Sequence, residues 1–209
     1  MAYVRKNTTA EPNSPSPLLV VSRPDICAHP CIQVLDAMHP GETCRIVNFY
    51  HDIRDKSSLK TLLVLDLEAT TPTLVIGDFN THSRTWSPAG TDPSSWARKL
   101  EEWTVGNLLT LANDPGVITR QGGDNERDSV LDLAWYNAAT INEATFSNLK
   151  VDWEGSLGSD HAALHVVARR TRDPYAHPNI PLDHGYQIED GVKQKWQEAF
   201  ESLSRLRDL

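Results

Sequence analysis

The segment TLVIGDFN, residues 73–80, joins an apolar run to a short polar sequence and decides how the rest of the chain is interpreted. The continuous run at residues 73–76 is typical of a buried strand. Asp78 and Asn80 follow Gly77. Because side chains alternate along an extended backbone, we expect Asp78 and Asn80 to point together into a site. A local turn, in which both side chains bind nearby backbone N–H groups, is the structural alternative.

Two further strand-like segments carry polar residues of the same kind. Asp132 interrupts the apolar run VLDLAW at residues 130–135, and Asp160 with His161 precedes another apolar segment. An isolated buried charge costs several kcal/mol, so Asp132 must be paired or face a site. A turn or helix cap would also explain Asp160 and His161. A shared site is the simplest account of all three clusters, and we predict that Asp132 accepts a hydrogen bond from His161 at about 2.7–3.0 Å.

These residue types are the ones that phosphodiester hydrolysis requires. A hard oxygen ligand holds Mg²⁺, a carboxylate aligns or deprotonates water, and a histidine held by a carboxylate contacts the phosphate. Asn80 would orient the nucleophile, and Tyr50 would donate a hydrogen bond to a phosphate oxygen.

The remaining pattern predicts a two-sheet α/β sandwich with helices outside, because short strands alternate with few helices. We expect strands at residues 18–21, 31–36, 44–50, 73–76, 117–119, 130–135, 149–153 and 162–167, and helices at 57–67 and 94–109. Ser57 or Ser58 could cap the first helix. Three prolines in 172–181 indicate a linker, and 188–206 predicts an amphipathic helix whose apolar stripe docks on the domain or on another chain.

Composition restricts the classes of protein that fit. The 209 residues carry a formal net charge of −8, which counts against tight non-specific DNA binding but not against a carboxylate metal site. The sequence shows neither a membrane-spanning apolar run nor a signal-peptide core, so we expect an intracellular protein. The three cysteines favour a reducing compartment, and Cys27, His29 and Cys31 lack the second ligand pair of a structural zinc site.

Four segments together resemble a known family. LVIGDFN (74–80) and GSDH (158–161) resemble the signature segments of the endonuclease/exonuclease/phosphatase family, and SVLD (129–132) and VNFY (47–50) resemble two of its other strands. The resemblance covers roughly residues 1–170. LVIGDFNTHS with Trp86, and then RDS at 127–129, is similar to the endonuclease part of fungal non-LTR retrotransposon polyproteins. The resemblance implies a DNase I-like domain at 1–171, followed by a linker and helix at 172–209 leading toward a reverse transcriptase.

The resemblance also implies a Mg²⁺- or Mn²⁺-dependent endonuclease acting on DNA inside the cell, the nucleus included. The implied roles are Asp160 as metal ligand, His161 as phosphate contact or base, Asp132 orienting His161, Asp78 activating water, Asn80 positioning it and Tyr50 supporting the phosphate.

Family members begin with a strand ending in Asn, a helix, and a strand ending in a metal-binding Glu. This chain begins near the third strand, so we expect a metal site one ligand short and an exposed sheet edge open to self-association. Two hypotheses follow: a weak metal-dependent nuclease, or a catalytically inactive remnant that acts as an interaction module.

Overall fold

The computed structural model describes residues 19–39, 42–137, 139 and 146–168. The expected linker and helix at 172–209, and therefore the predicted domain boundary, lie outside these residues. Six strands form one sheet in the order β1-β2-β3-β4-β6-β5. Their bounds are β1 (Leu19–Ser22), β2 (Ile32–His39), β3 (Glu42–Tyr50), β4 (Thr73–Asp78), β5 (Leu109–Leu111) and β6 (Asp132–Asn137).

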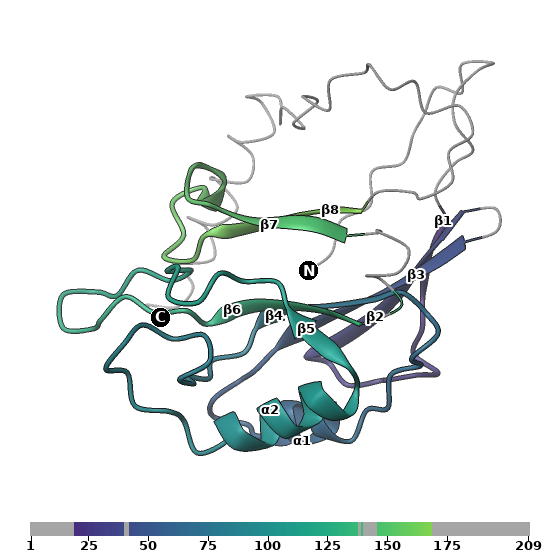
Figure 1. The fold of residues 1–209 in the computed structure, drawn as a ribbon, viewed down its shortest axis with the longest axis horizontal. Coiled ribbons are helices and arrows are strands. Elements are labelled where there is room, and N and C mark those ends of the chain that lie inside the picture. Colours follow the sequence, from purple (N-terminus) through teal and green to yellow (C-terminus); the bar gives the residue numbers. More distant parts are fainter. Residues whose placement is uncertain (1–18, 40–41, 138, 140–145, 169–209) are drawn as a thin grey trace, which may run out of the picture.

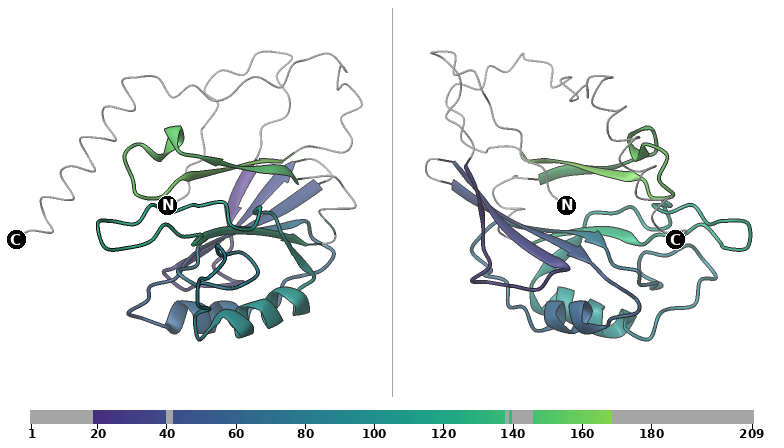
Figure 2. Two further views of the ribbon diagram at one scale, coloured as in Figure 1. Left: turned by 60° about the vertical axis from the view of Figure 1, so that its left-hand side comes forward. Right: turned by 180° about the vertical axis from the view of Figure 1, so that it is seen from behind.

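The sheet is mixed, because β3 and β4 run parallel while the other neighbours run antiparallel. Helix α1 (Ser57–Leu63) lies in the crossover from β3 to β4, and α2 (Ala97–Gly106) precedes β5. A second sheet pairs β7 (Phe146–Asp152) with β8 (Ala163–Ala168), which the short 3₁₀ helix η1 (Glu154–Ser156) helps to connect. Both helices cover one face of the six-stranded sheet, and β7 and β8 lie over the other (Figures 1 and 2). This confirms the predicted two-sheet sandwich with outer helices.

Alternation along β3 shows why the helix face holds the core. Val47 and Phe49 are buried on that face, Asn48 is half-buried on the opposite face, and Tyr50 is exposed. Aromatic rings connect the core: Phe79 lies 4.7 Å from Phe49 and 4.5 Å from Trp135 between ring centroids. The core also includes Leu59, Leu62, Trp86, Leu100 and Trp103. The strand ends that carry the polar clusters therefore rest on a tightly packed layer.

Four local expectations were wrong. The first helix ends at Leu63 and not at residue 67. The second helix runs from Ala97 to Gly106 and not from 94 to 109, and residue 109 begins β5. Residues 117–119 do not form a strand, although Arg120 makes isolated bridges to Ser129 and His161. Neither serine caps α1, because Lys56 is the capping residue and makes no side-chain cap bond. The serine hydroxyls are used elsewhere: Ser57 Oγ lies 3.0 Å from His29 Nε2, and Ser58 Oγ lies 3.2 Å from His51 Nδ1.

A buried ion network stabilises the outer strands of the sheet. Asp36 on β2 is 3% exposed and accepts a 2.9 Å hydrogen bond from Nε of Arg45 on β3. Arg23 binds the same carboxylate and also Asp25. Burial alone would raise the pKa of Asp36, but the two arginines outweigh burial and hold it below its usual value.

The region of Cys27, His29 and Cys31 is a hydrogen-bonded loop. His29 Nδ1 accepts a 3.1 Å bond from the Cys31 backbone N–H, so both ring nitrogens of His29 have protein partners. Cys27, Cys31 and Cys44 are free thiols. Among the described residues, no helix is long and apolar enough to cross a membrane.

Candidate active site at the ends of three strands

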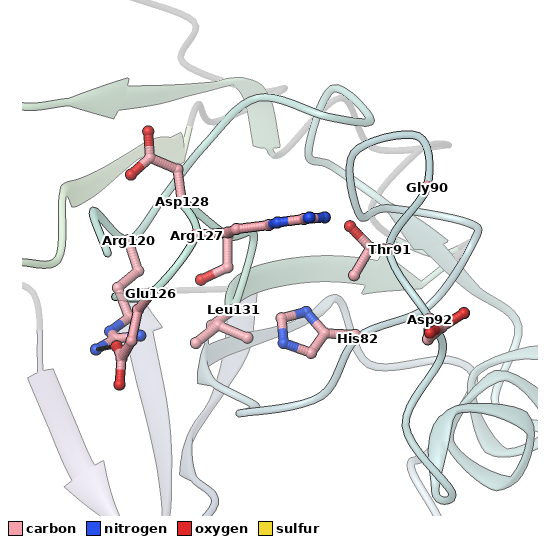
Figure 3. A pocket seen from close by; sticks show the side chains of 10 residues that line it. His82, Gly90, Thr91, Asp92, Arg120, Glu126, Arg127, Asp128 and Leu131 are labelled. Carbon is pink, nitrogen blue, oxygen red and sulfur yellow. Dashed lines mark hydrogen bonds and ion pairs between the residues drawn. The ribbon is translucent and has the colours of Figure 1, made fainter. Parts of the chain in front are cut away.

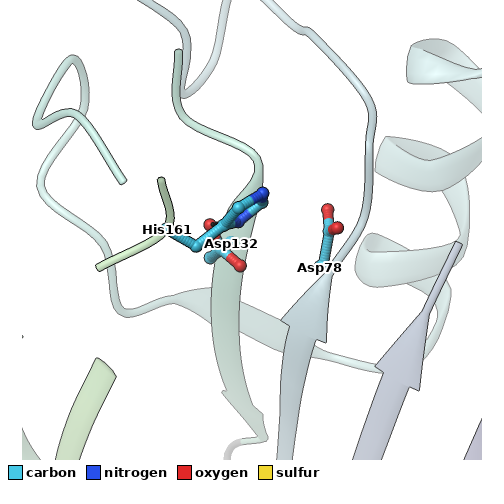
Figure 4. A group of neighbouring side chains, drawn as sticks. All are labelled: Asp78, Asp132 and His161. Atoms are coloured by element: carbon cyan, nitrogen blue, oxygen red, sulfur yellow. Dashed lines mark hydrogen bonds and ion pairs between the residues drawn. The ribbon is translucent and has the colours of Figure 1, made fainter. Parts of the chain in front are cut away.

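Three neighbouring strands deliver polar side chains to one edge of the large sheet. Asp78 is the last residue of β4 and Asp132 the first of β6, and the two are direct register partners. Tyr50, the last residue of β3, is the register partner of Asp78 on its other side. Paired residues in a sheet point to the same face, so this register brings the two carboxylates together, as Figure 4 shows.

Gly77 makes the close approach of β3 and β4 possible. A Cβ on this residue would lie 1.8 Å from the backbone oxygen of Phe49, and its φ of +152° is one that side chains with a Cβ rarely adopt. The glycine of the GDFN segment therefore fixes the backbone that carries Asp78.

Asp78 and Asn80 lie together, but through a turn and not through strand alternation. Asn80 has a left-handed φ of 41°, and its backbone N–H donates to Asp78 Oδ1 at 3.0 Å. Its side-chain amide donates to Asp78 Oδ2 at 3.0 Å and to the backbone oxygen of His51 at 2.9 Å. The structural alternative, an Asx turn, is therefore present, and it also fixes both side chains in the site.

His161 lies where the sequence predicted. Its Nδ1 is 2.8 Å from Asp132 Oδ2, within the predicted range. Because a carboxylate only accepts, Nδ1 carries the proton and Nε2 is left facing away from Asp132. The hydrogen bond to Asp132 raises the pKa of His161, with further contributions from the charges of Asp132, Asp78 and Asp160 against the effect of burial.

The cluster is crowded with negative charge. Ligand atoms of Asp78, Asp132 and His161 all lie within 4.8 Å of one another. Burial, followed by the neighbouring charge of Asp132, raises the pKa of Asp78 from 3.8 to about 6. A carboxylate with a strongly perturbed pKa beside a histidine–carboxylate pair is characteristic of functional sites.

Asp160 lies at the rim of this cluster and forms an ion pair with Arg120. Its carboxylate is 59% exposed and lies 3.2 Å from Nε of Arg120, which also donates to Glu126 at 2.6 Å. The metal-ligand role of Asp160 stays a prediction. Arg120 itself was missed from the sequence, because nothing in a lone arginine before a polar loop shows which carboxylates it will bind.

Tyr50 is half-exposed beside the cluster. Its side chain lines a cavity of about 620 Å³ with Gln33 and Asn48 on the same face of the sheet. Its phosphate-supporting role also stays a prediction.

A second cavity of about 440 Å³ adjoins the site between the loop after β4 and the loop before β6 (Figure 3). Arg127 extends across it toward Thr91, with the ring of His82 on another wall. Among the described side chains, His82 Nδ1 and Ser129 Oγ are buried without a hydrogen-bond partner. This polar cavity is a feature that the sequence patterns did not indicate.

Comparison with known proteins agrees with this geometry. The profile of the endonuclease-reverse transcriptase family matches residues 44–165, more than half of the chain. The chain belongs to this family. The match spans β3 to β8 and therefore includes every strand of the site.

One solved structure shows the same fold as this endonuclease-reverse transcriptase chain. The endonuclease domain of TRAS1, a telomere-specific non-LTR retrotransposon, superposes with a TM-score of 0.59 at 18% identity over 74% of this chain and 70% of that one. An endonuclease/exonuclease/phosphatase family protein from Leptotrichia buccalis gives a TM-score of 0.42 at 14% identity, over 66% of this chain and 53% of that one. The catalytic domain of human Nocturnin gives 0.31 at 16% identity, over 70% and 48%. No curated protein sequence matches significantly.

Proposed function

We propose that this chain hydrolyses phosphodiester bonds in DNA with the help of a divalent cation, as the endonuclease domain of a retroelement. The observation that carries the proposal is the arrangement of His161, Asp132 and Asp78: a histidine held by one carboxylate, beside a second carboxylate whose pKa is about 6. A base with a pKa near neutrality is effective in accepting a proton from water.

Each side chain has a distinct part in this proposal. Asp132 accepts the Nδ1–H of His161 and raises its pKa, which favours the protonated ring, so that Nε2–H donates to the substrate phosphate. Asp78 accepts a proton from the attacking water. The amide group of Asn80 already donates to Asp78 and to the His51 backbone, which leaves its Oδ1 to accept from that water. Tyr50 donates to a phosphate oxygen.

The donor set fits a hard divalent cation such as Mg²⁺ or Mn²⁺. Asp78 and Asp132 offer carboxylate oxygens within one small space, and such oxygens are ligands that a hard divalent cation prefers. Asp160 is the further carboxylate proposed as a ligand. When bound, the cation would supply charge neutralisation for the phosphate.

We expect the activity of this chain to be low. Asp160 is not part of the group formed by Asp78, Asp132 and His161, whose ligand atoms lie within 4.8 Å of one another, so a cation bound by that group has few protein ligands. The net charge of −8 also opposes accumulation of DNA at the surface. The same two observations favour the second candidate, an inactive interaction module, and self-association through a sheet edge belongs to that proposal.

A plasmid-nicking assay distinguishes the two candidates. The wild-type protein with Mg²⁺ should nick supercoiled DNA, and EDTA should abolish nicking. His161→Ala should reduce the rate by about 100-fold or more, since the contact to the phosphate in the transition state is lost. His165→Ala is the matched control, because His165 forms a similar 3.1 Å pair with Asp152 on the second sheet, away from the site. Equal rates for the two variants, or no nicking by the wild type, would favour the inactive module.

A further inference from the structure

The Arg120 side chain forms hydrogen bonds to two loops. Among the described residues, the other hydrogen bonds between these loops are made by backbone groups. One is the loop from 121 to 128, in which all side chains are exposed and the glycine at 122 is half-buried. The other is the loop that carries Asp160 and His161. Arg120 Nη2 donates to Glu126 on the first loop, and its Nε donates to Asp160 on the second.

The backbone places Arg120 between the same two partners. Arg120 and Ser129 exchange two 2.9 Å hydrogen bonds on one side. On the other side, the Gln121 N–H donates to the Asp160 oxygen and the Ala162 N–H donates to the Thr119 oxygen, both at 2.8 Å. This short ladder brackets His161, so a change in the position of residue 120 is transmitted directly to the catalytic histidine.

Geometry explains why an arginine stands at this position. Its guanidinium presents several N–H groups in a rigid planar fork, and here two of them bind carboxylates from different loops. A lysine offers one point charge and cannot hold both carboxylates in the same way. The Arg120 side chain is 25% exposed, against 59% for each carboxylate, so it is the most buried of the three groups.

We propose that Arg120 is a positioning residue for the active site, and that Glu126, which contacts no reacting group, acts on catalysis by holding Arg120 in place. This inference rests on the proposed function. Glu126 fixes the guanidinium, the guanidinium fixes the Asp160 carboxylate, and the backbone ladder transmits this placement to His161. The exposed loop at 121–128 thereby controls turnover.

Steady-state cleavage of a labelled DNA duplex tests the relay through a double-mutant cycle. Arg120→Ala should lower kcat by about 10–100-fold, the range common for residues that orient metal ligands, and Glu126→Ala should lower kcat by a smaller factor. KM should not rise in Glu126→Ala, because removing an acid does not weaken DNA binding. Glu126→Ala should have no further effect in the Arg120→Ala background, since Glu126 acts through Arg120. Arg120→Lys should not restore the wild-type kcat.

Asp124→Ala is the matched control, because it removes one negative charge from the same exposed loop. Within the described residues Asp124 makes no hydrogen bond or ion pair, so the kcat of the Asp124→Ala variant should equal that of the wild type. A wild-type kcat for Glu126→Ala, additive effects in the double variant, or rescue by lysine would overturn the proposal. Equal losses in Glu126→Ala and Asp124→Ala would do so as well.

A second measurement does not depend on cleavage. In ¹⁵N-labelled protein, Glu126→Ala should shift the backbone amide signals of Asp160 and His161, and Asp124→Ala should leave them in place. If the wild-type chain does not cleave DNA, the proposed function fails while these signals still decide whether the relay exists. Unshifted signals in Glu126→Ala would overturn the relay even in an active enzyme.

Discussion

Replacing Asp78 by Asn should stabilise the fold while it removes cleavage activity. In the folded chain the pKa of Asp78 is raised from 3.8 to about 6, first by burial and second by Asp132. A difference of about two pKa units corresponds to about 3 kcal/mol between the protonated and ionised states. Because the site is partly open to solvent, we expect Asp78→Asn to raise the free energy of unfolding by about 1–3 kcal/mol at pH 8. The asparagine retains an oxygen for the Asn80 backbone N–H.

The sign of the pH dependence follows from the raised pKa. An acid with a higher pKa in the folded state stabilises that state when protonated, and this contribution is lost as the pH rises from about 4 through about 6. Asp78→Asn has no such loss. The stability difference between variant and wild type should therefore be large at pH 8 and small at pH 4.

Urea denaturation in the presence of EDTA measures this difference, with fluorescence of the buried Trp86, Trp103 and Trp135 as the probe. Asp124→Asn, on an exposed loop, serves as the control and should leave stability unchanged at both pH values. A gain of equal size at pH 4 and pH 8, or a loss of stability at pH 8, would refute the argument that Asp78 is held in an unfavourable charged state.

Two further substitutions test the scaffold beneath the site. Gly77→Ala should lower the free energy of unfolding by more than about 4 kcal/mol, because its Cβ would overlap the Phe49 backbone oxygen. The variant should fail to express in soluble form or melt at a sharply lower temperature by circular dichroism. Gly106→Ala is the control and should be neutral or slightly stabilising, because the space around Gly106 is open. Asp36→Asn should cost about 3 kcal/mol at pH 7 by leaving the buried Arg45 with only its 3.8 Å contact to the exposed Glu68. Because the pKa of Asp36 is lowered, its contribution is present above the ordinary aspartate pKa and lost as the pH falls through the folded-state pKa. The difference between variant and wild type in urea titrations should therefore shrink in acid.

The parts of the site that the sequence predicted are those set by strand ends and by pairing rules. Asp132 is an acid inside an apolar run, so it required a partner, and His161 supplies it. Asp78 follows a buried strand, so it had to lie at a sheet edge. Both arguments use only the local pattern and the cost of burying charge, and both hold in the structure.

The parts that the sequence did not predict depend on long-range placement. Strand β5 is three residues long and pairs with β6 across more than 20 intervening residues, so its alternation is too short to recognise. Ser57 and Ser58 have the composition of helix caps, yet His29 and His51 compete successfully for their hydroxyls. The spacing of Asp78 and Asn80 suggested an extended strand, but Asn80 lies in a turn. The partners of Arg120 lie on two loops that are distant in the sequence, so they could not be inferred from the residues around it.

The energetics of the sheet explain how such an unfavourable group of charges persists. One face of the sheet is packed against α1 and α2 through Phe49, Phe79 and Trp135, and Gly77 fixes the spacing of β3 and β4 beneath Asp78. This packing outweighs the repulsion between Asp78 and Asp132, which the folded chain therefore cannot relax by moving the strands apart. Burial and, second to it, this repulsion keep the pKa of Asp78 raised, and a divalent cation bound near the carboxylates would offset the repulsion. The affinity of the proposed cation site is in this way set by the apolar layer on the opposite face of the sheet.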